Sequence, residues 1–263
     1  MSLTPLYYPP FIIDGSRAPA DFKGDWNAAG YQAAVLGCLK ELYRWETSRL
    51  VLRHIPDSKV RIVPERRHHE PAAGYAGGVL EFTPGKRIKS SKSYIEVKPD
   101  AGWTADQGLL HESWHAMRAF AGYDEDDNDL LRTVRVRFFP GVMPQELEFT
   151  RRAELLSITA VNVYWSEKNR GRSHHPRAGR DQVLLRSDHE AFNVLLGPQE
   201  FHKNAIVKRE LLKFAVQQPR VFLQLMQISA DFNAFRDIAL SEESVTMSEV
   251  KDAVRDHIRS IWF

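Results

Sequence analysis

The chain has 263 residues, of which 43% are hydrophobic and 27% are charged, so it can form a substantial core in one large or two small domains. Its 36 basic and 34 acidic residues nearly balance, and the net charge of +2 gives no general case for binding nucleic acids or membranes. The single cysteine, Cys38, excludes an intramolecular disulfide and a thiolate-rich zinc site.

The first part of the chain predicts an irregular arm followed by a long helix. Prolines at positions 5, 9, 10 and 19 interrupt residues 1–26, where few apolar positions recur at a regular spacing. Residues 28–53 carry apolar side chains near every 3.6 positions, among them Tyr31, Leu39 and Leu42. We therefore expect an arm of little chemical interest and one amphipathic helix.

Three short strands are expected next, at residues 60–63, 79–82 and 93–97, where β-branched and aromatic residues gather. Residues 71–78 are rich in glycine and are expected to form a flexible loop. A strand at the edge of a sheet can accept an extended peptide through backbone pairing. Residues 79–82 and 94–97 are the two candidates for such an edge, with two internal strands as the alternative.

A helix that carries a metal-binding pattern follows these strands. Thr104 and Gln107 have the spacing of a capping box, and Gly122 is a typical helix stop, so we expect a helix between them. His111 and His115 lie within it. Residues four apart share one face of a helix, so the two imidazoles can bind a single metal ion.

Glu112 completes the pattern H-E-x-x-H, which is typical of zinc hydrolases. Such a site needs two histidine ligands, an open position for water and a carboxylate that takes the proton of that water. A purely structural metal site has no need of this base. The alternative is an amphipathic helix whose two histidines only form hydrogen bonds.

The rest of the chain is expected to be mainly helical. The acidic segment 124–129 is expected to be a solvated turn, and residues 134–139 alternate like a hairpin strand or a flap. Helices are expected at 144–168, at 198–217, at 219–240 with a break near 231–233, and at 247–262, with a loop or hairpin at 169–189.

A catalytic zinc site normally has three protein ligands, so one more His, Asp or Glu is needed. Glu154 is the preferred candidate, because it lies in a segment otherwise free of charge, where a buried carboxylate is costly unless a cation meets it. Asp124 or Asp127 in the acidic turn is the alternative ligand. For Glu154 itself, the alternatives are a salt bridge with Arg151 or Arg152 and a simply exposed helix face.

The reaction also needs a donor that stabilises the oxyanion formed when water attacks a carbonyl. Tyr164, His174 and His175 are candidates because they follow Glu154 on the same helix and the loop after it. We select Tyr164 and His175 as catalytic residues beside Glu112. The group at residues 68–70, His-His-Glu, is a lesser candidate because it lies in a basic loop.

The H-E-x-x-H helix followed by a glutamate on a separate helix resembles the zincin metallopeptidases whose third ligand is glutamate, the gluzincins. More narrowly, this helix and residues 152–164 are similar to bacterial metallopeptidases of the type III effector and toxin-associated class. The resemblance spans roughly residues 60–175. It implies an α+β zincin fold in which a small sheet of three to four strands packs on the motif helix. Zn²⁺ would be held by His111, His115 and Glu154.

We therefore expect one zincin-like domain over residues 1–263, with the irregular arm at 1–26, a catalytic core at 27–175 and a helical C-terminal subdomain at 176–263. The expected function is that of a zinc-dependent metalloendopeptidase. The resemblance implies a bacterial effector or toxin delivered into another cell. A catalytically inactive zincin-like binding protein and a metal hydrolase of small amides are the alternatives.

Location and partners complete the expectations. The sequence holds no apolar stretch of membrane-spanning length, and its start lacks the basic and apolar regions of a Sec-type signal. We expect synthesis in the cytoplasm, with a specialised secretion system as the route of any export into a host or neighbouring cell. We expect a protein or peptide substrate and no nucleic-acid or membrane partner. An inhibitory or secretion partner and the oligomeric state stay open.

Overall fold

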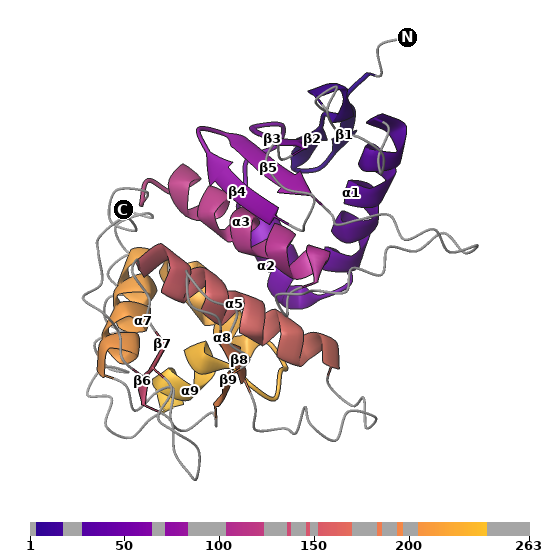
Figure 1. The fold of residues 1–263 in the computed structure, drawn as a ribbon. Coiled ribbons are helices and arrows are strands. Elements are labelled where there is room, and N and C mark those ends of the chain that lie inside the picture. The colour runs from indigo at the N-terminus through magenta and orange to yellow at the C-terminus, as the bar shows by residue number, and fades with distance from the viewer. Residues whose placement is uncertain are drawn as a thin grey trace. The chain divides into compact units, whose positions relative to one another are not determined.

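The computed structural model describes residues 4–17, 28–64, 72–83, 104–123, 136–137, 146–147, 152–169, 183–185, 194–196 and 205–240. The chain divides into two compact units, Met1–Glu125 and Asp126–Phe263 (Figure 1). The expected boundary between a catalytic core and a helical part was at residue 175, whereas the compact units divide at residue 125. The described helices and strands make the protein α+β.

The first unit contains a five-stranded mixed sheet. In spatial order its strands are β1 (Leu6–Tyr8), β2 (Phe11–Ile13), β3 (Val60–Val63), β5 (Val79–Thr83) and β4 (Ala72–Ala76). The three central strands β2, β3 and β5 are parallel, and β1 and β4 pair antiparallel at the two sides. The strands expected at 60–63 and 79–82 are confirmed, and the one at 93–97 lies outside the described residues.

The expectation of an irregular arm was wrong for residues 6–17, which form β1, β2 and the short 3-10 helix η1 (Gly15–Arg17). Phe11 and Ile13 are fully buried, because they pair with Val60 and Ile62 of β3 in the middle of the sheet. The adjacent prolines 9 and 10 occupy the turn between β1 and β2, where no ladder hydrogen bond is lost.

The expectation of a flexible loop at 71–78 was also wrong, because β4 runs from Ala72 to Ala76. Gly77 and Gly78 have φ angles of +55° and +80°, which suits the two-residue turn of a tight hairpin. β5 is therefore an inner strand between β3 and β4 and not an edge. Among the described strands, β4 forms that side of the sheet.

Three helices of the first unit are described: α1 (Ala28–Leu42), α2 (Glu46–Arg53) and α3 (Ala105–Phe120). The single helix expected at 28–53 is thus two helices. The carbonyl of Leu42 accepts hydrogen bonds from the Trp45 N–H and the Ser48 hydroxyl, which ends the helical ladder of α1. Helix α3 contacts α1, α2, β4 and β5, so the motif helix packs on the sheet as expected, although the sheet has five strands where three to four were expected.

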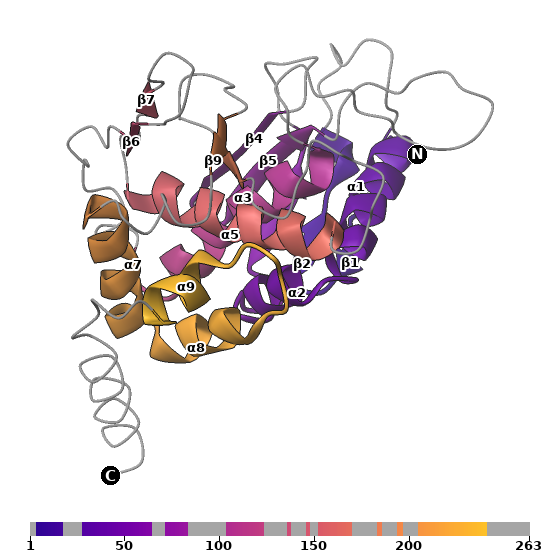
Figure 2. The same ribbon diagram turned by 90° about the horizontal axis from the view of Figure 1, so that it is seen from below.

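The second unit is built mainly from helices α5 (Arg152–Asn169), α7 (Ala205–Gln217), α8 (Pro219–Gln227) and α9 (Ala234–Leu240). Figure 2 shows α7, α8 and α9 side by side, and α5 also contacts α7. Two short hairpins pair β6 (Val136–Arg137) with β7 (Glu146–Leu147) and β8 (Val183–Leu185) with β9 (Val194–Leu196). No helix of the described residues is long and apolar enough to cross a membrane.

The helix expected at 144–168 begins later, because residues 146–147 pair with 136–137 as a strand ladder. The helix expected at 198–217 is described from Ala205 onward. The break near 231–233 is confirmed, since α8 ends at Gln227 and α9 begins at Ala234. The expected helix at 247–262 lies outside the described residues.

Candidate metal centre

Helix α3 begins and ends where its sequence predicts. The Thr104 N–H donates a hydrogen bond to Oε1 of Gln107 at 2.8 Å, as in a capping box. At the other end, the Tyr123 N–H donates to the Arg118 carbonyl at 3.1 Å, and Gly122 has a φ of +82°. These two ends fix the register of the helix and therefore the face on which its histidines lie.

The apolar side chains of α3 hold the helix in the core of the first unit. Leu109, Leu110 and Met117 are fully buried. Ser113 and Trp114, the two variable residues of the motif, are also fully buried, and the Ser113 hydroxyl donates to the Leu109 carbonyl at 2.7 Å. Both residues are thus part of the packed core and do not obstruct the partly exposed face of the helix.

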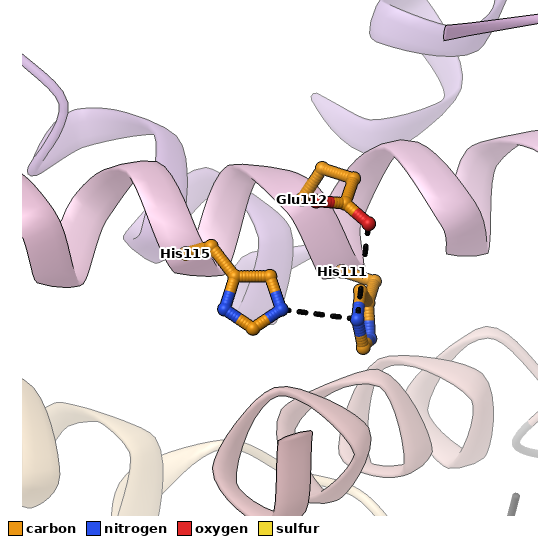
Figure 3. Close-up of side chains that lie close together, drawn as sticks. All are labelled: His111, Glu112 and His115. Carbon is orange, nitrogen blue, oxygen red and sulfur yellow. Dashed lines mark hydrogen bonds and ion pairs between the residues drawn. The ribbon is translucent and has the colours of Figure 1, made fainter. Parts of the chain in front are cut away.

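His111, Glu112 and His115 lie together on α3 (Figure 3). Nε2 of His111 is 3.1 Å from Nε2 of His115, and the two rings meet edge to face with centroids 4.7 Å apart. Nε2 of His111 is 3.9 Å from Oε1 of Glu112. One ligand atom from each residue lies within 4.8 Å of the other two, so all three can reach one ion.

The donor set and its spacing fit a zinc ion. Zinc–nitrogen bonds of about 2.0–2.1 Å at a tetrahedral angle put two ligand nitrogens about 3.3 Å apart. The observed separation of 3.1 Å between the two Nε2 atoms is close to this value. The same distance also fits a hydrogen bond in which one imidazole donates to the other. Metal binding is therefore the property that distinguishes the two interpretations.

The environment of the group combines burial with limited access. The side chains of His111 and Glu112 are 12% and 10% exposed, and His115 is partly exposed. A carboxylate this deeply buried is costly unless a cation or a donor meets it. A cation held by His111 and His115 would lie close to Glu112 and offset the cost of its burial. The arrangement can thus hold a divalent ion and present a base beside it.

Two other predicted site residues, Glu154 and Tyr164, lie on α5 in the second unit. Glu154 lies in the first turn of α5 in the second unit, is partly exposed, and its carbonyl accepts a hydrogen bond from the Ser157 hydroxyl at 3.1 Å. Its role as third ligand stays a prediction. Tyr164 is fully buried on α5, with Nζ of Lys168 5.6 Å from the centre of its ring.

Several candidates lie outside the described residues. They are His174 and His175, the acidic residues Asp124 and Asp127, Arg151, and the group His68, His69 and Glu70. Gly108 and Ala119 lie on the same helix face as the histidines, three residues before His111 and four after His115, and both are partly exposed.

Comparison of the chain with protein-family models, with curated proteins and with solved structures finds no match. The functional conclusion therefore depends on the geometry of the His111, Glu112 and His115 group itself.

Proposed function

We propose that the protein is a zinc-dependent hydrolase of peptide bonds in protein substrates, a zincin of the gluzincin type. The observation that carries this proposal is the pair of imidazole Nε2 atoms 3.1 Å apart on one partly exposed helix face, with the Glu112 carboxylate beside them. Two nitrogen ligands and an adjacent base are the parts that metal-assisted hydrolysis requires from one helix.

Each residue has a distinct role in this proposal. His111 and His115 would hold the ion, which would supply Lewis-acid chemistry by lowering the pKa of a water molecule and polarising the scissile carbonyl. The Glu112 carboxylate takes the proton of the attacking water and returns it to the leaving amine. Tyr164 or His175 supplies the donor to the oxyanion, as expected from the sequence.

Glu154 is the proposed third ligand. Its neighbours Ala153 and Leu155 are buried, and α5 carries no charged side chain from Leu155 to Trp165. A carboxylate among such residues is stabilised by a cation. Glutamate in this role also matches the gluzincin resemblance of the sequence.

The sheet supports a peptide substrate over a small amide. β4 contacts α3 and pairs with β5 on one side, and among the described strands it has no second neighbour. An extended chain can add to such a strand through backbone hydrogen bonds. A peptide bound along β4 would run beside the helix that carries the histidines.

The zinc content of the purified chain and its variants tests whether His111, His115 and Glu154 bind the metal. The purified full-length chain should hold about one zinc per molecule after dialysis, measured by elemental analysis. His111→Ala, His115→Ala and Glu154→Gln should lose or greatly weaken the zinc. The matched control is His54→Ala, a histidine at the end of α2 whose Nδ1 is 2.8 Å from the Leu50 carbonyl, and it should keep the zinc. An unmodified chain that binds no zinc would overturn the proposal.

The rate of peptide-bond cleavage tests the role of Glu112 as the base. Incubation of an unfolded protein substrate with the zinc-loaded chain should generate new N-termini, counted by mass spectrometry. Glu112→Gln should keep the zinc, and its cleavage rate should be about 10²–10⁴-fold lower, which is the range typical of the loss of a general base. Equal cleavage by the unmodified chain and Glu112→Gln would rule out this role of Glu112. Zinc binding with no cleavage in either would favour a zincin-like binding protein.

A further inference from the structure

We draw no further inference here: the strongest candidate, the stripe of polar side chains formed by Thr159, Asn162 and Ser166 along α5, carries nothing, because the hydroxyls of Thr159 and Ser166 form hydrogen bonds within the fold and nothing in the described part of the chain shows a ligand for the buried, unpaired amide of Asn162.

Discussion

At the scale of single residues, Asp14 shows how a buried carboxylate is kept ionised. Its side chain is 4% exposed, and its Oδ2 accepts a hydrogen bond from Nη1 of Arg61 at 2.8 Å. Its Oδ1 accepts from the Ser16 N–H and hydroxyl. Burial alone would raise the pKa of Asp14, but the bonds from Ser16 and Arg61 outweigh burial and hold this pKa below its usual value.

This lowered pKa predicts a stability that depends on pH. Because the pKa of Asp14 is lower in the folded chain than in the unfolded chain, its contribution is present above about pH 4 and is lost as the pH falls through the folded value. Asp14→Asn should lower the free energy of unfolding by about 1–2 kcal/mol at pH 7. The deficit should shrink when urea unfolding is repeated at pH 3.

The exposed residue Asp57 provides the control for this experiment. Asp57→Asn should change the free energy of unfolding little at either pH, because it removes no buried interaction. A deficit of Asp14→Asn that stays the same from pH 7 to pH 3 would contradict the role given to the ionised carboxylate.

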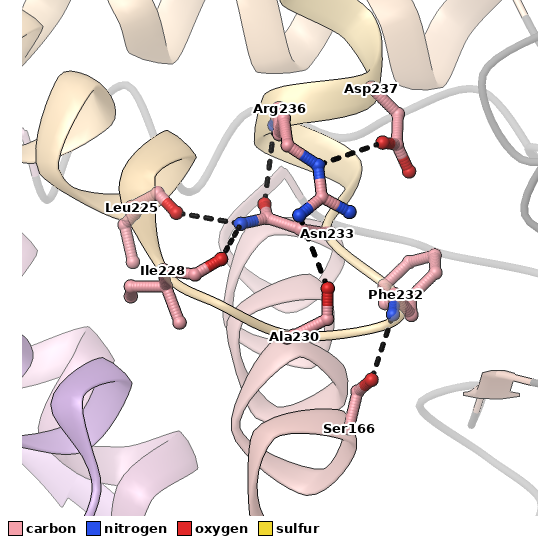
Figure 4. Close-up of polar contacts among 8 residues, drawn as sticks. All are labelled: Ser166, Leu225, Ile228, Ala230, Phe232, Asn233, Arg236 and Asp237. Carbon is pink, nitrogen blue, oxygen red and sulfur yellow. Dashed lines mark hydrogen bonds and ion pairs between the residues drawn. The ribbon is translucent and has the colours of Figure 1, made fainter. Parts of the chain in front are cut away.

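At the scale of elements, the turn between α8 and α9 is held by the side chain of Asn233 (Figure 4). Its Nδ2 donates to the carbonyls of Leu225 and Ile228 at 2.8 and 3.2 Å, and its Oδ1 accepts from the Arg236 N–H at 3.2 Å. Asn233 is fully buried, so no water replaces these partners. One side chain thus ends α8 and caps α9.

Two substitutions separate these tasks of Asn233. Asn233→Ser should still cap α9 but remove the amide donor to the carbonyls of Leu225 and Ile228, which keep only the backbone N–H bonds from Ile228 and Ala230. The expected loss is about 0.5–1.5 kcal/mol in the free energy of unfolding. Asn233→Ala should lose about 1 kcal/mol more, because the cap is also removed. Urea unfolding measures both. Equal stability of the two variants would show that the cap contributes nothing.

The hairpin of β4 and β5 depends on its glycine turn. Gly78 has a φ of +80°, and a Cβ there would lie 3.2 Å from the Lys59 carbonyl oxygen. Gly78→Ala should therefore reduce the free energy of unfolding by about 1–2 kcal/mol or more. Gly37→Ala, at an exposed helical glycine without a positive φ, should be neutral or stabilising. Equal effects in thermal melts would contradict this account of the turn.

The elements that the sequence predicts well are those with local signals. Helix α3 has a cap, a period and a stop within a single segment, and β3 ends at a proline. By contrast, β2 is recognisable only through its pairing with β3, far along the chain. β4 consists of alanines, one glycine and one tyrosine, and its alanines and glycine are poor strand signals. It is a strand because β5 lies beside it.

At the scale of the whole molecule, the same distinction applies to the candidate site. His111, Glu112 and His115 share one helix, so their spacing in sequence already determines their spacing in space. Glu154, Tyr164 and His175 lie elsewhere in the chain, and no local pattern fixes where they stand relative to the histidines. Their roles stay predictions that ligand and donor substitutions will test.

Zinc should stabilise the whole chain by mass action. At free zinc about 100 times its dissociation constant, binding to the folded state alone adds about 2.7 kcal/mol and raises the melting temperature by about 5–10 °C. Calorimetric scans with zinc and with a chelator measure this difference. His54→Ala should show the same rise and His111→Ala none. A rise of equal size in His111→Ala would place the bound zinc elsewhere.

Cys38 has a practical consequence for such measurements. It is the single thiol in the chain, and in α1 of the unit that carries the histidines it is only 8% exposed. A buried thiol reacts with a solution reagent only when the surrounding structure opens, so its rate of modification under native conditions reports the opening of that unit. The modification rate of Cys38 therefore measures the opening of this unit without an engineered label, and bound zinc should lower that rate.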